Sequence, residues 1–222
     1  MALNQVGLRI NTEYQRIDAA LVERARKVPV AVVGDVANRL QSFGAGFLQY
    51  GSKKKFAGPA LTVRVPPGDN LMLHKALDLA QAGDVIVIDA GGALNTAIFG
   101  AMMSSYAVSH GIEALVVDGA IRDVEELAHL NLAVVARGAT PNGPYKNGPG
   151  EIGYSIACGG LSIAPGDLII GDLDGVLILP QGNVASLIDL AEGKAALEAT
   201  WEVEIAAGTW SRAWVDEALQ KL

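Results

Sequence analysis

The chain has 222 residues, of which 50% are hydrophobic and 18% are charged, and its formal net charge is −7. This apolar content excludes a disordered chain, because its burial offsets the entropy lost on folding. The acidic balance argues against a general nucleic-acid binder, and a single cysteine, Cys158, excludes internal disulfides and cysteine-rich metal sites. With no apolar run of about 18 residues and a polar N-terminal segment, we expect a soluble cytoplasmic protein without a membrane span.

The N-terminal quarter of the chain predicts two helices and a strand. Residues 12–27 show the apolar spacing of an amphipathic helix with Thr12 as its N-cap, and residues 31–40 predict a second, shorter helix. The run Lys53–Lys55 is most simply a solvated loop; the alternative is a positive surface that attracts an anionic substrate. Residues 56–65 then alternate as a strand does.

From residue 71 to residue 136, helical patterns alternate with short apolar runs rich in β-branched residues. Such runs are typical of strands buried on both faces of a sheet. The expected helices cover 71–80, 98–110 and 122–130, and the expected strands cover 85–89, 114–118 and 132–136. This alternation predicts parallel crossover units and therefore an α/β fold.

The last third of the chain predicts a different pattern. A loop rich in Gly, Pro and Asn leads to a short strand, then to a hairpin whose Asp172 and Asp174 are more simply turn residues than a metal pair, and finally to a long helix. No repeat or linker divides the chain. We therefore predict one domain over residues 1–222, with a core at about 30–180 and an extending C-terminal helix at about 183–207.

Two segments that follow buried strands are candidates for a binding site. In parallel sheets, ligands bind beyond the carboxyl ends of the strands, where glycines let the first amides of a helix approach an anion. The glycine-containing segment 90–97 follows one strand, and 119–123 follows the next. In the second segment Arg122 offers a planar fork for a carboxylate or keto-enolate, and Asp123 is an oxygen donor suited to Mg²⁺ or Mn²⁺. The alternative is that Asp123 caps a helix and Arg122 pairs with a carboxylate.

Other polar residues have structural interpretations. We expect a hydrogen-bonded structural role for His74, on an otherwise apolar helix face, and dipole-compensating positions at helix ends for His110 and His129. Asp89 and Asp118 end buried strands, where they favour turns, with support of a metal site as the alternative.

Several sequence blocks carry a resemblance to a known family. They are GPALTV, LHKAL followed by GDVIVID, IFGAMM, GIEALVVDGAIRDVEEL and GGLSIAPGDLIIGDLDGVLILP, in that order. Over about residues 30–205 the chain resembles the RraA-like family, which contains the class II 4-hydroxy-4-methyl-2-oxoglutarate (HMG/CHA) aldolases and the regulator of ribonuclease E activity. The resemblance implies a compact α/β/α fold of the swivelling β/β/α type, and homotrimers, sometimes doubled to hexamers, with active sites between subunits.

The resemblance also implies residue roles. Asp123 would hold a divalent metal, Mg²⁺ or Mn²⁺, mostly through waters, and Arg122 would contact the keto oxygen of pyruvate. Such a metal stabilises the enolate released by carbon–carbon cleavage, and oxaloacetate decarboxylation passes through the same enolate. The pyruvate carboxylate would bind the helix start, with Met102 and Met103 supplying the amides after Gly100 and Ala101.

One departure from the family concerns Ala101, which stands where the aldolases have an acidic residue that helps hold metal-bound waters and relay protons. Losing an acid–base group costs about 10²–10⁴ in rate. Asn95 could supply polarity nearby, and Glu126 completes the matching Arg-Asp-x2-Glu block. In the family a C-terminal carboxylate of a neighbouring subunit also contributes. The candidates for it are two carboxylates whose simpler interpretation is an exposed helix surface, Glu198 and Glu202.

Three hypotheses follow. The first is a metal-dependent lyase acting on pyruvate-derived oxo acids, HMG aldolase-like with oxaloacetate decarboxylase side activity. The second is a non-catalytic regulator that binds a ribonuclease or another protein partner, for which an acidic surface is suitable. The third is a related metal-dependent enzyme with a different substrate, for which Ala101 makes room.

Overall fold

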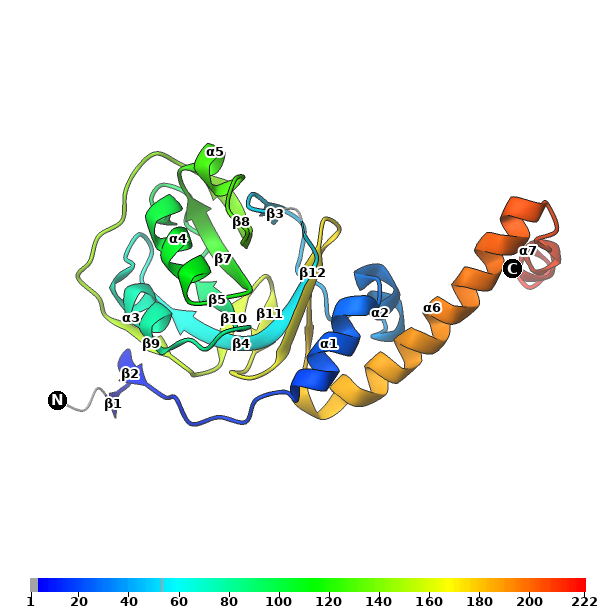
Figure 1. The fold of residues 1–222 in the computed structure, drawn as a ribbon, viewed down its shortest axis with the longest axis horizontal. Helices are drawn as coiled ribbons and strands as arrows, with labels where there is room; N and C mark the ends of the chain where they lie inside the picture. Colours follow the sequence, from blue (N-terminus) through cyan, green and yellow to red (C-terminus); the bar gives the residue numbers. More distant parts are fainter. Residues whose placement is uncertain (1–3, 53) are drawn as a thin grey trace.

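Four parallel strands form the centre of the fold, in the spatial order β4 (Phe56–Arg64), β5 (Val85–Asp89), β7 (Ala114–Ile121) and β8 (Ala133–Ala139). The computed structural model describes residues 4–52 and 54–222 (Figure 1). Strands β5 and β7 are buried almost throughout, which explains their continuous apolar sequences. The predicted crossover pattern is therefore confirmed.

Different elements cover the two faces of this sheet. Helices α3 (Leu71–Leu79), α4 (Ala101–Ser109) and the short α5 (Val124–Leu127) lie on one face, and the hairpin of β10 (Ile156–Cys158) and β11 (Leu161–Ile163) packs on the other. The expected mixed α/β domain with a long C-terminal helix is confirmed. Its layers are helix, sheet and β-hairpin, which fits the β/β/α description better than helices on both faces.

Further strands extend the sheet. On the β4 side lie β9 (Gly150–Ile152), β2 (Leu8–Ile10) and β1 (Asn4–Gln5), and on the β8 side lies β3 (Leu48–Gln49). The short β6 (Ala97–Phe99) pairs with the end of β7. The first half of β4 also pairs with β12 (Leu168–Asp172), which forms a hairpin with β13 (Gly175–Leu179). In its turn the Asp174 amide donates to Asp172 Oδ1 at 2.9 Å, so the predicted turn is confirmed.

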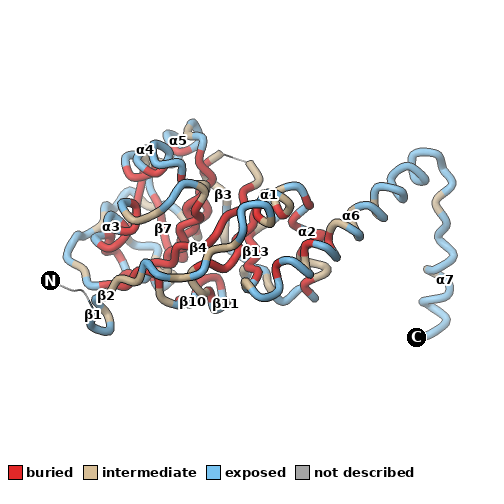
Figure 2. The backbone as a smooth tube through the Cα atoms, turned by 60° about the horizontal axis from the view of Figure 1, so that its bottom comes forward, coloured by how far each residue is buried: buried red, intermediate tan, exposed pale blue. Residues whose placement is uncertain are grey.

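A second core joins three helices to the β12–β13 hairpin. It contains apolar side chains from α1 (Ala19–Lys27), α2 (Val30–Val36) and the first half of α6 (Val184–Ala207), which follows a 3₁₀ turn at Gln181–Asn183. Beyond this core α6 projects away from the domain and ends near α7 (Ala213–Leu219) (Figures 1 and 2). We call residues 195–222 the C-terminal arm. None of the described helices is both long and apolar enough to cross a bilayer.

The predicted helix over 12–27 is wrong in its first half. The helix begins at Ala19, and its N-cap is Asp18, whose Oδ1 accepts the amide of Ala20 at 2.8 Å. Tertiary contacts hold the preceding segment outside the helix. The amide of Asn11 donates to Ile152 of β9 at 2.9 Å, and the side chain of Arg16 pairs with buried Asp84.

The boundaries of α2, α4, α5 and β7 also differ from their predicted positions. The helix predicted over 31–40 is α2, which ends at Val36 because Asn38 and Arg39 have positive φ. The helix predicted over 98–110 starts only at Ala101, since the preceding residues form β6. The helix predicted over 122–130 is reduced to α5, and β7 runs three residues beyond its predicted end.

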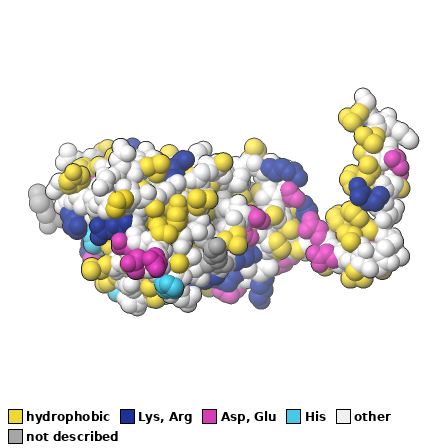
Figure 3. Space-filling model, turned by 90° about the horizontal axis from the view of Figure 1, so that it is seen from above, with side chains coloured by type: hydrophobic (Ala, Val, Ile, Leu, Met, Phe, Trp, Pro, Cys, Tyr) yellow, Lys and Arg dark blue, Asp and Glu magenta, His cyan; other side chains and the backbone are white. Residues whose placement is uncertain are grey.

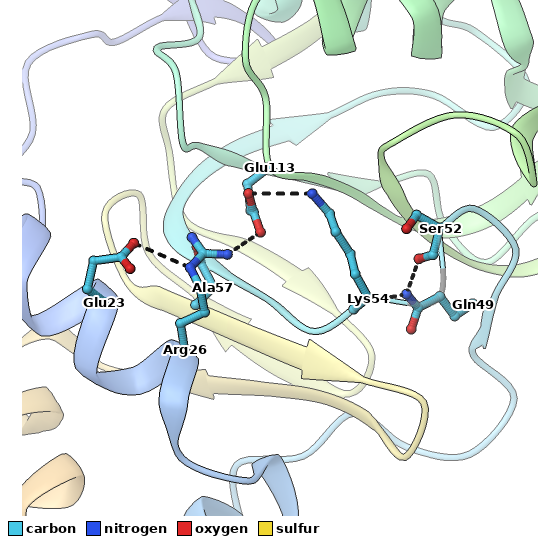
Figure 4. A network of polar contacts seen from close by, with 7 residues as sticks. All are labelled: Glu23, Arg26, Gln49, Ser52, Lys54, Ala57 and Glu113. Carbon is cyan, nitrogen blue, oxygen red and sulfur yellow. Dashed lines mark hydrogen bonds and ion pairs between the residues drawn. The ribbon is translucent and has the colours of Figure 1, made fainter.

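A polar network joins α1 to the amino end of β7 (Figure 4). The guanidinium of Arg26 pairs with Glu113, which directly precedes β7, and Lys54 Nζ lies 3.8 Å from the same carboxylate. Lys54 therefore lies at the end of β7 opposite the Arg-Asp pair, and the alternative of substrate attraction is not supported for it. Lys53 lies outside the described residues.

Two glycines provide a test of the packing. A Cβ on Gly58 of β4 would lie 2.2 Å from the carbonyl oxygen of Gly83, whereas a Cβ on Gly193 of α6 would meet nothing within 4 Å. We expect Gly58→Ala to lower the free energy of unfolding by about 1–3 kcal/mol. Gly193→Ala should raise it by about 0.5–1 kcal/mol, because alanine is the better helix former. Urea unfolding at one protein concentration measures both, and equal stabilities would contradict the described packing of β4.

Candidate active site at the end of strand β7

The predicted Arg-Asp pair lies where β7 ends and α4 begins. The amide of Arg122 donates to the carbonyl of Phe99 at 3.0 Å, which holds the pair beside the helix start. Asp123 is left-handed, with φ 58° and ψ 43°, and this turns the chain sharply toward α5. Its Oδ2 accepts the amide of Ala101 at 3.0 Å and lies 3.5 Å from Arg122 Nε. The Asp123 carboxylate therefore caps α4, the helix of the neighbouring crossover, rather than its own helix.

Gly100 makes this approach possible. A Cβ at this position would lie 2.2 Å from Asp123 Oδ2 and 2.8 Å from Arg122 Cγ, so any larger residue would displace the pair. The first amides of an α-helix have no acceptor within the helix. Asp123 satisfies that of Ala101, and the amides of Met102 and Met103 belong to the same turn. The predicted anion-binding backbone thus lies beside the predicted pair.

A cavity of about 120 Å³ brings the pair together with residues from two further segments. Helix α3 and its start contribute Asn70 and His74, and the loop after β8 contributes Lys146. This loop also passes over Arg122, because a Cβ on Gly143 would lie 2.8 Å from Arg122 Nη1. A second, shallower hollow of about 360 Å³ lies on the other side of the pair, between α5 and residues 139–141.

Asn70 was not singled out from the sequence, yet it is the most buried polar side chain that lines this cavity, with 2% exposed. Its Nδ2 donates to the carbonyl of Ile98 at 2.9 Å, which fixes the orientation of the amide. Its Oδ1 has no hydrogen-bond partner among the described residues. A buried acceptor without a donor is costly, so Asn70 is suited to receive a hydroxyl or a water in the cavity.

His74 differs from its expected structural role. No hydrogen bond holds its imidazole among the described residues, and the ring lines the cavity. Burial lowers the pKa of the His74 imidazole, and the positive charge of Lys146 lowers it further, against a smaller opposing effect of Asp78. The signal in the sequence was the spacing of Asn70 and His74, which places both on one face of a helix.

Four predicted site residues lie away from the cavity. Asn95 is exposed on the β5–β6 connection, where its carbonyl accepts Asn142 Nδ2 at 2.9 Å, and Glu126 is exposed on α5. Glu198 and Glu202 lie on the C-terminal arm; Glu198 is 3.6 Å from Lys194 Nζ, and Glu202 is exposed. Within one chain, none of these four residues lines the cavity that contains the Arg-Asp pair.

Asp89 and Asp118 are held by other partners. Asp89 Oδ1 accepts the amide of Gly91 at 3.0 Å, as expected of a turn residue. Asp118 lies inside β7, pairs with Arg137 of β8 and accepts the amide of Gly159 at 3.0 Å. Asp118 is therefore a paired sheet residue and not a turn residue.

The donor set fits one kind of metal site. No group of three or more His, Cys, Asp or Glu side chains suited to a metal occurs in residues 4–52 and 54–222. Asp123 is 36% exposed, and its Oδ1 has no hydrogen bond within this part of the chain. A single accessible carboxylate suits Mg²⁺, which keeps several waters and binds through one or two carboxylates, whereas a zinc cage needs more protein ligands.

Comparisons with known proteins agree with this architecture. The model of the RraA-like family, described as Aldolase/RraA, matches residues 21–178. A protein of Halalkalibacterium halodurans, provisionally named a 4-hydroxy-4-methyl-2-oxoglutarate aldolase, is 39% identical over 79% of this chain and 83% of its own length. The aldolase of that name from Thermus thermophilus is 37% identical over 61% of this chain and 82% of its own.

A solved structure extends the similarity beyond the matched domain. It is that of RraAS2 from Streptomyces coelicolor, described as an unusual member of the RNase ES inhibitor RraA protein family. Its TM-score is 0.77 at 28% identity, over 85% of this chain and 98% of that one.

The conformation of Asp123 gives a prediction about its side chain. Asparagine tolerates the left-handed region, and its side-chain oxygen can accept a hydrogen bond from the Ala101 amide. The free energy of unfolding of Asp123→Asn should therefore lie within about 0.5 kcal/mol of that of the native protein. Asp123→Ala should lose about 1–2 kcal/mol from the left-handed backbone, and more from the lost hydrogen bond. Urea unfolding measures both. Equal losses in the two variants would mean that the charge, and not the backbone and hydrogen bond, sets the stability here.

Proposed function

This chain belongs to the RraA-like family, and we propose that it is a divalent-metal-dependent lyase that acts on pyruvate-derived oxo acids. The proposal is that it cleaves 4-hydroxy-4-methyl-2-oxoglutarate or a related compound and decarboxylates oxaloacetate as a side activity. The observation that carries it is the contact of the Asp123 carboxylate with the start of α4, beside Arg122. The aldolase names of two relatives support it.

Each polar group of the cavity would bind a different part of the substrate or the metal, according to its charge. The amides of Met102 and Met103 would hold the substrate carboxylate at the positive end of α4. The guanidinium of Arg122, 44% exposed, would donate to the keto oxygen and share the negative charge that develops there. Asp123 would hold Mg²⁺ or Mn²⁺, which when bound supplies Lewis-acid stabilisation of an enolate.

The arm supports an assembly in which subunits complete one another's sites. Its exposed side chains include Leu197, Trp201, Val203, Ile205 and Trp214, and the arm stands clear of the rest of the chain (Figure 3). Apolar side chains gathered on one projecting element mark an interaction surface. We therefore propose a homotrimer or hexamer in which Glu198 or Glu202 of one subunit faces the Arg-Asp pair of its neighbour.

The alanine at position 101 favours two alternatives to an HMG-type aldolase. Without an acidic side chain at the start of α4, the site has one carboxylate, Asp123, within its cavity. A regulator that binds a ribonuclease or another protein would need no acid there, and the RNase ES inhibitor family of the Streptomyces relative is consistent with it. A metal-dependent enzyme with a different substrate would use the space instead.

Pyruvate release is the direct test of the lyase. With Mg²⁺ we expect pyruvate from oxaloacetate, from 4-hydroxy-4-methyl-2-oxoglutarate or from both, and a chelator should abolish it. Asp123→Asn should keep the fold and lose the activity, and Arg122→Lys should lose about 10²–10³ in kcat because lysine lacks the planar fork. A coupled dehydrogenase assay measures the release. No turnover with either substrate would exclude the lyase and favour the regulator. Full activity in Asp123→Asn would instead exclude Asp123 as the metal ligand.

The variant Ala101→Asp distinguishes two hypotheses: an HMG-type aldolase that lacks the acidic side chain at position 101, and a related enzyme that acts on a different substrate. If the site is that of an HMG-type aldolase, the new carboxylate should raise aldol cleavage by up to about 10²-fold. The same assay measures it, and Ala101→Asn, which has the same shape but no charge, is the control. A lower rate in both variants would indicate that the space at this position serves a different substrate.

A further inference from the structure

His74 lies at the boundary of two hollows that meet at the start of α4. One is the polar cavity that contains Arg122 and Asp123. The other is a groove of about 270 Å³ between α3 and α4, lined apart from His74 by Leu77, Met102, Met103 and Tyr106. A substrate whose carboxylate binds the α4 amides and whose keto oxygen meets Arg122 would therefore extend past the imidazole. The groove would receive its far end.

The surroundings of the imidazole suit proton transfer. The charged and titratable groups that face it are Asp78 on its own helix, Tyr106 on α4, Lys146 on the loop after β8, and the Arg122–Asp123 pair after β7. Tyr106 Oη donates to Asp78 Oδ1 at 3.0 Å, so these two groups satisfy each other. Burial and the positive charge of Lys146 lower the pKa of the His74 imidazole and so favour its neutral form, which can accept a proton.

The other polar groups of the cavity cannot do this. An arginine guanidinium does not lose its proton in proteins, a lysine ammonium has no acceptor, and an asparagine amide does not titrate. The carboxylate of Asp123 is engaged by the Ala101 amide and is the proposed metal ligand. Among the described residues that line the cavity, His74 is thus the titratable base that has no competing role.

We propose that His74 is the acid–base residue of this site, an inference that rests on the proposed lyase function. The imidazole takes the proton of the substrate's C4 hydroxyl, the C4–O bond becomes a carbonyl, and the electrons of the C3–C4 bond pass to C3 to form the enolate of pyruvate. The imidazolium then returns the proton to C3. Proton and electrons balance without another reactant. Oxaloacetate decarboxylation has no hydroxyl proton to remove, so it needs this residue less.

The test compares His74→Gln with His129→Gln, a matched change at an exposed histidine that follows α5 and does not line the cavity. We expect His74→Gln to lose about 10²–10⁴ in kcat for aldol cleavage but less than 10-fold for decarboxylation. His129→Gln should leave both unchanged. In the native protein, kcat/KM for cleavage should fall as the pH drops below the pKa of His74, because protonation removes the lone pair, and His74→Gln should lack this acid limb.

Lys146→Met tests the same assignment without changing the histidine. Removing the positive charge should raise the pKa of the acid limb, whatever the effect on rate. The role of His74 would be overturned if kcat/KM for cleavage fell at the same low pH in His74→Gln and in Lys146→Met as in the native protein. Equal losses of cleavage and decarboxylation in a folded His74→Gln protein would also overturn it. Either result would leave the lyase function in place. Native protein that releases no pyruvate from either substrate would instead overturn the proposed function.

Discussion

The contact between Asp123 and the start of α4 organises the candidate site. One carboxylate oxygen satisfies the first amide of the helix, and the side chain lies so close to residue 100 that only glycine fits there. The contact joins two crossover units of the sheet at their carboxyl ends. Asp123, Met102 and Met103 line the same cavity, so the proposed metal ligand and the proposed carboxylate-binding amides belong to one site.

The two faces of the sheet carry different kinds of polar residues. The helical face carries the candidate site, because α3 and α4 approach each other above β5 and β7. On the other face, Arg64, Asp89 and Asp118 occupy in-register positions of β4, β5 and β7, and Arg137 of β8 pairs with Asp118. These charges pair with one another and with backbone amides near the β10–β11 hairpin. The hydrogen bond from the Gly159 amide to Asp118 ties the β10–β11 hairpin to the sheet.

The C-terminal arm has a different physical status from the domain. The first turns of α6 belong to the second core, but all three tryptophans of the chain lie on the arm, between residues 201 and 214. Arg212 lies over the rings of Trp210 and Trp214, at 5.3 and 5.9 Å. The arm therefore leaves large apolar side chains, Trp201 and Trp214 among them, exposed to water. The family model matches residues 21–178, which lie before α6.

The sequence alone determined the alternation of strands and helices, the position of the Arg-Asp pair and the glycine before α4, because apolar periodicity and turn residues act over a few positions. It misplaced the start of α1, where contacts with β9 and Asp84 hold the chain extended. The sequence predicted a purely structural role for His74, and it did not identify Asn70 or Lys146 as site residues. Only the tertiary structure decided that these three meet Arg122 and Asp123, since residues from three separate segments converge there. Such long-range proximity arises from the crossovers that wind the sheet, and no local pattern encodes it.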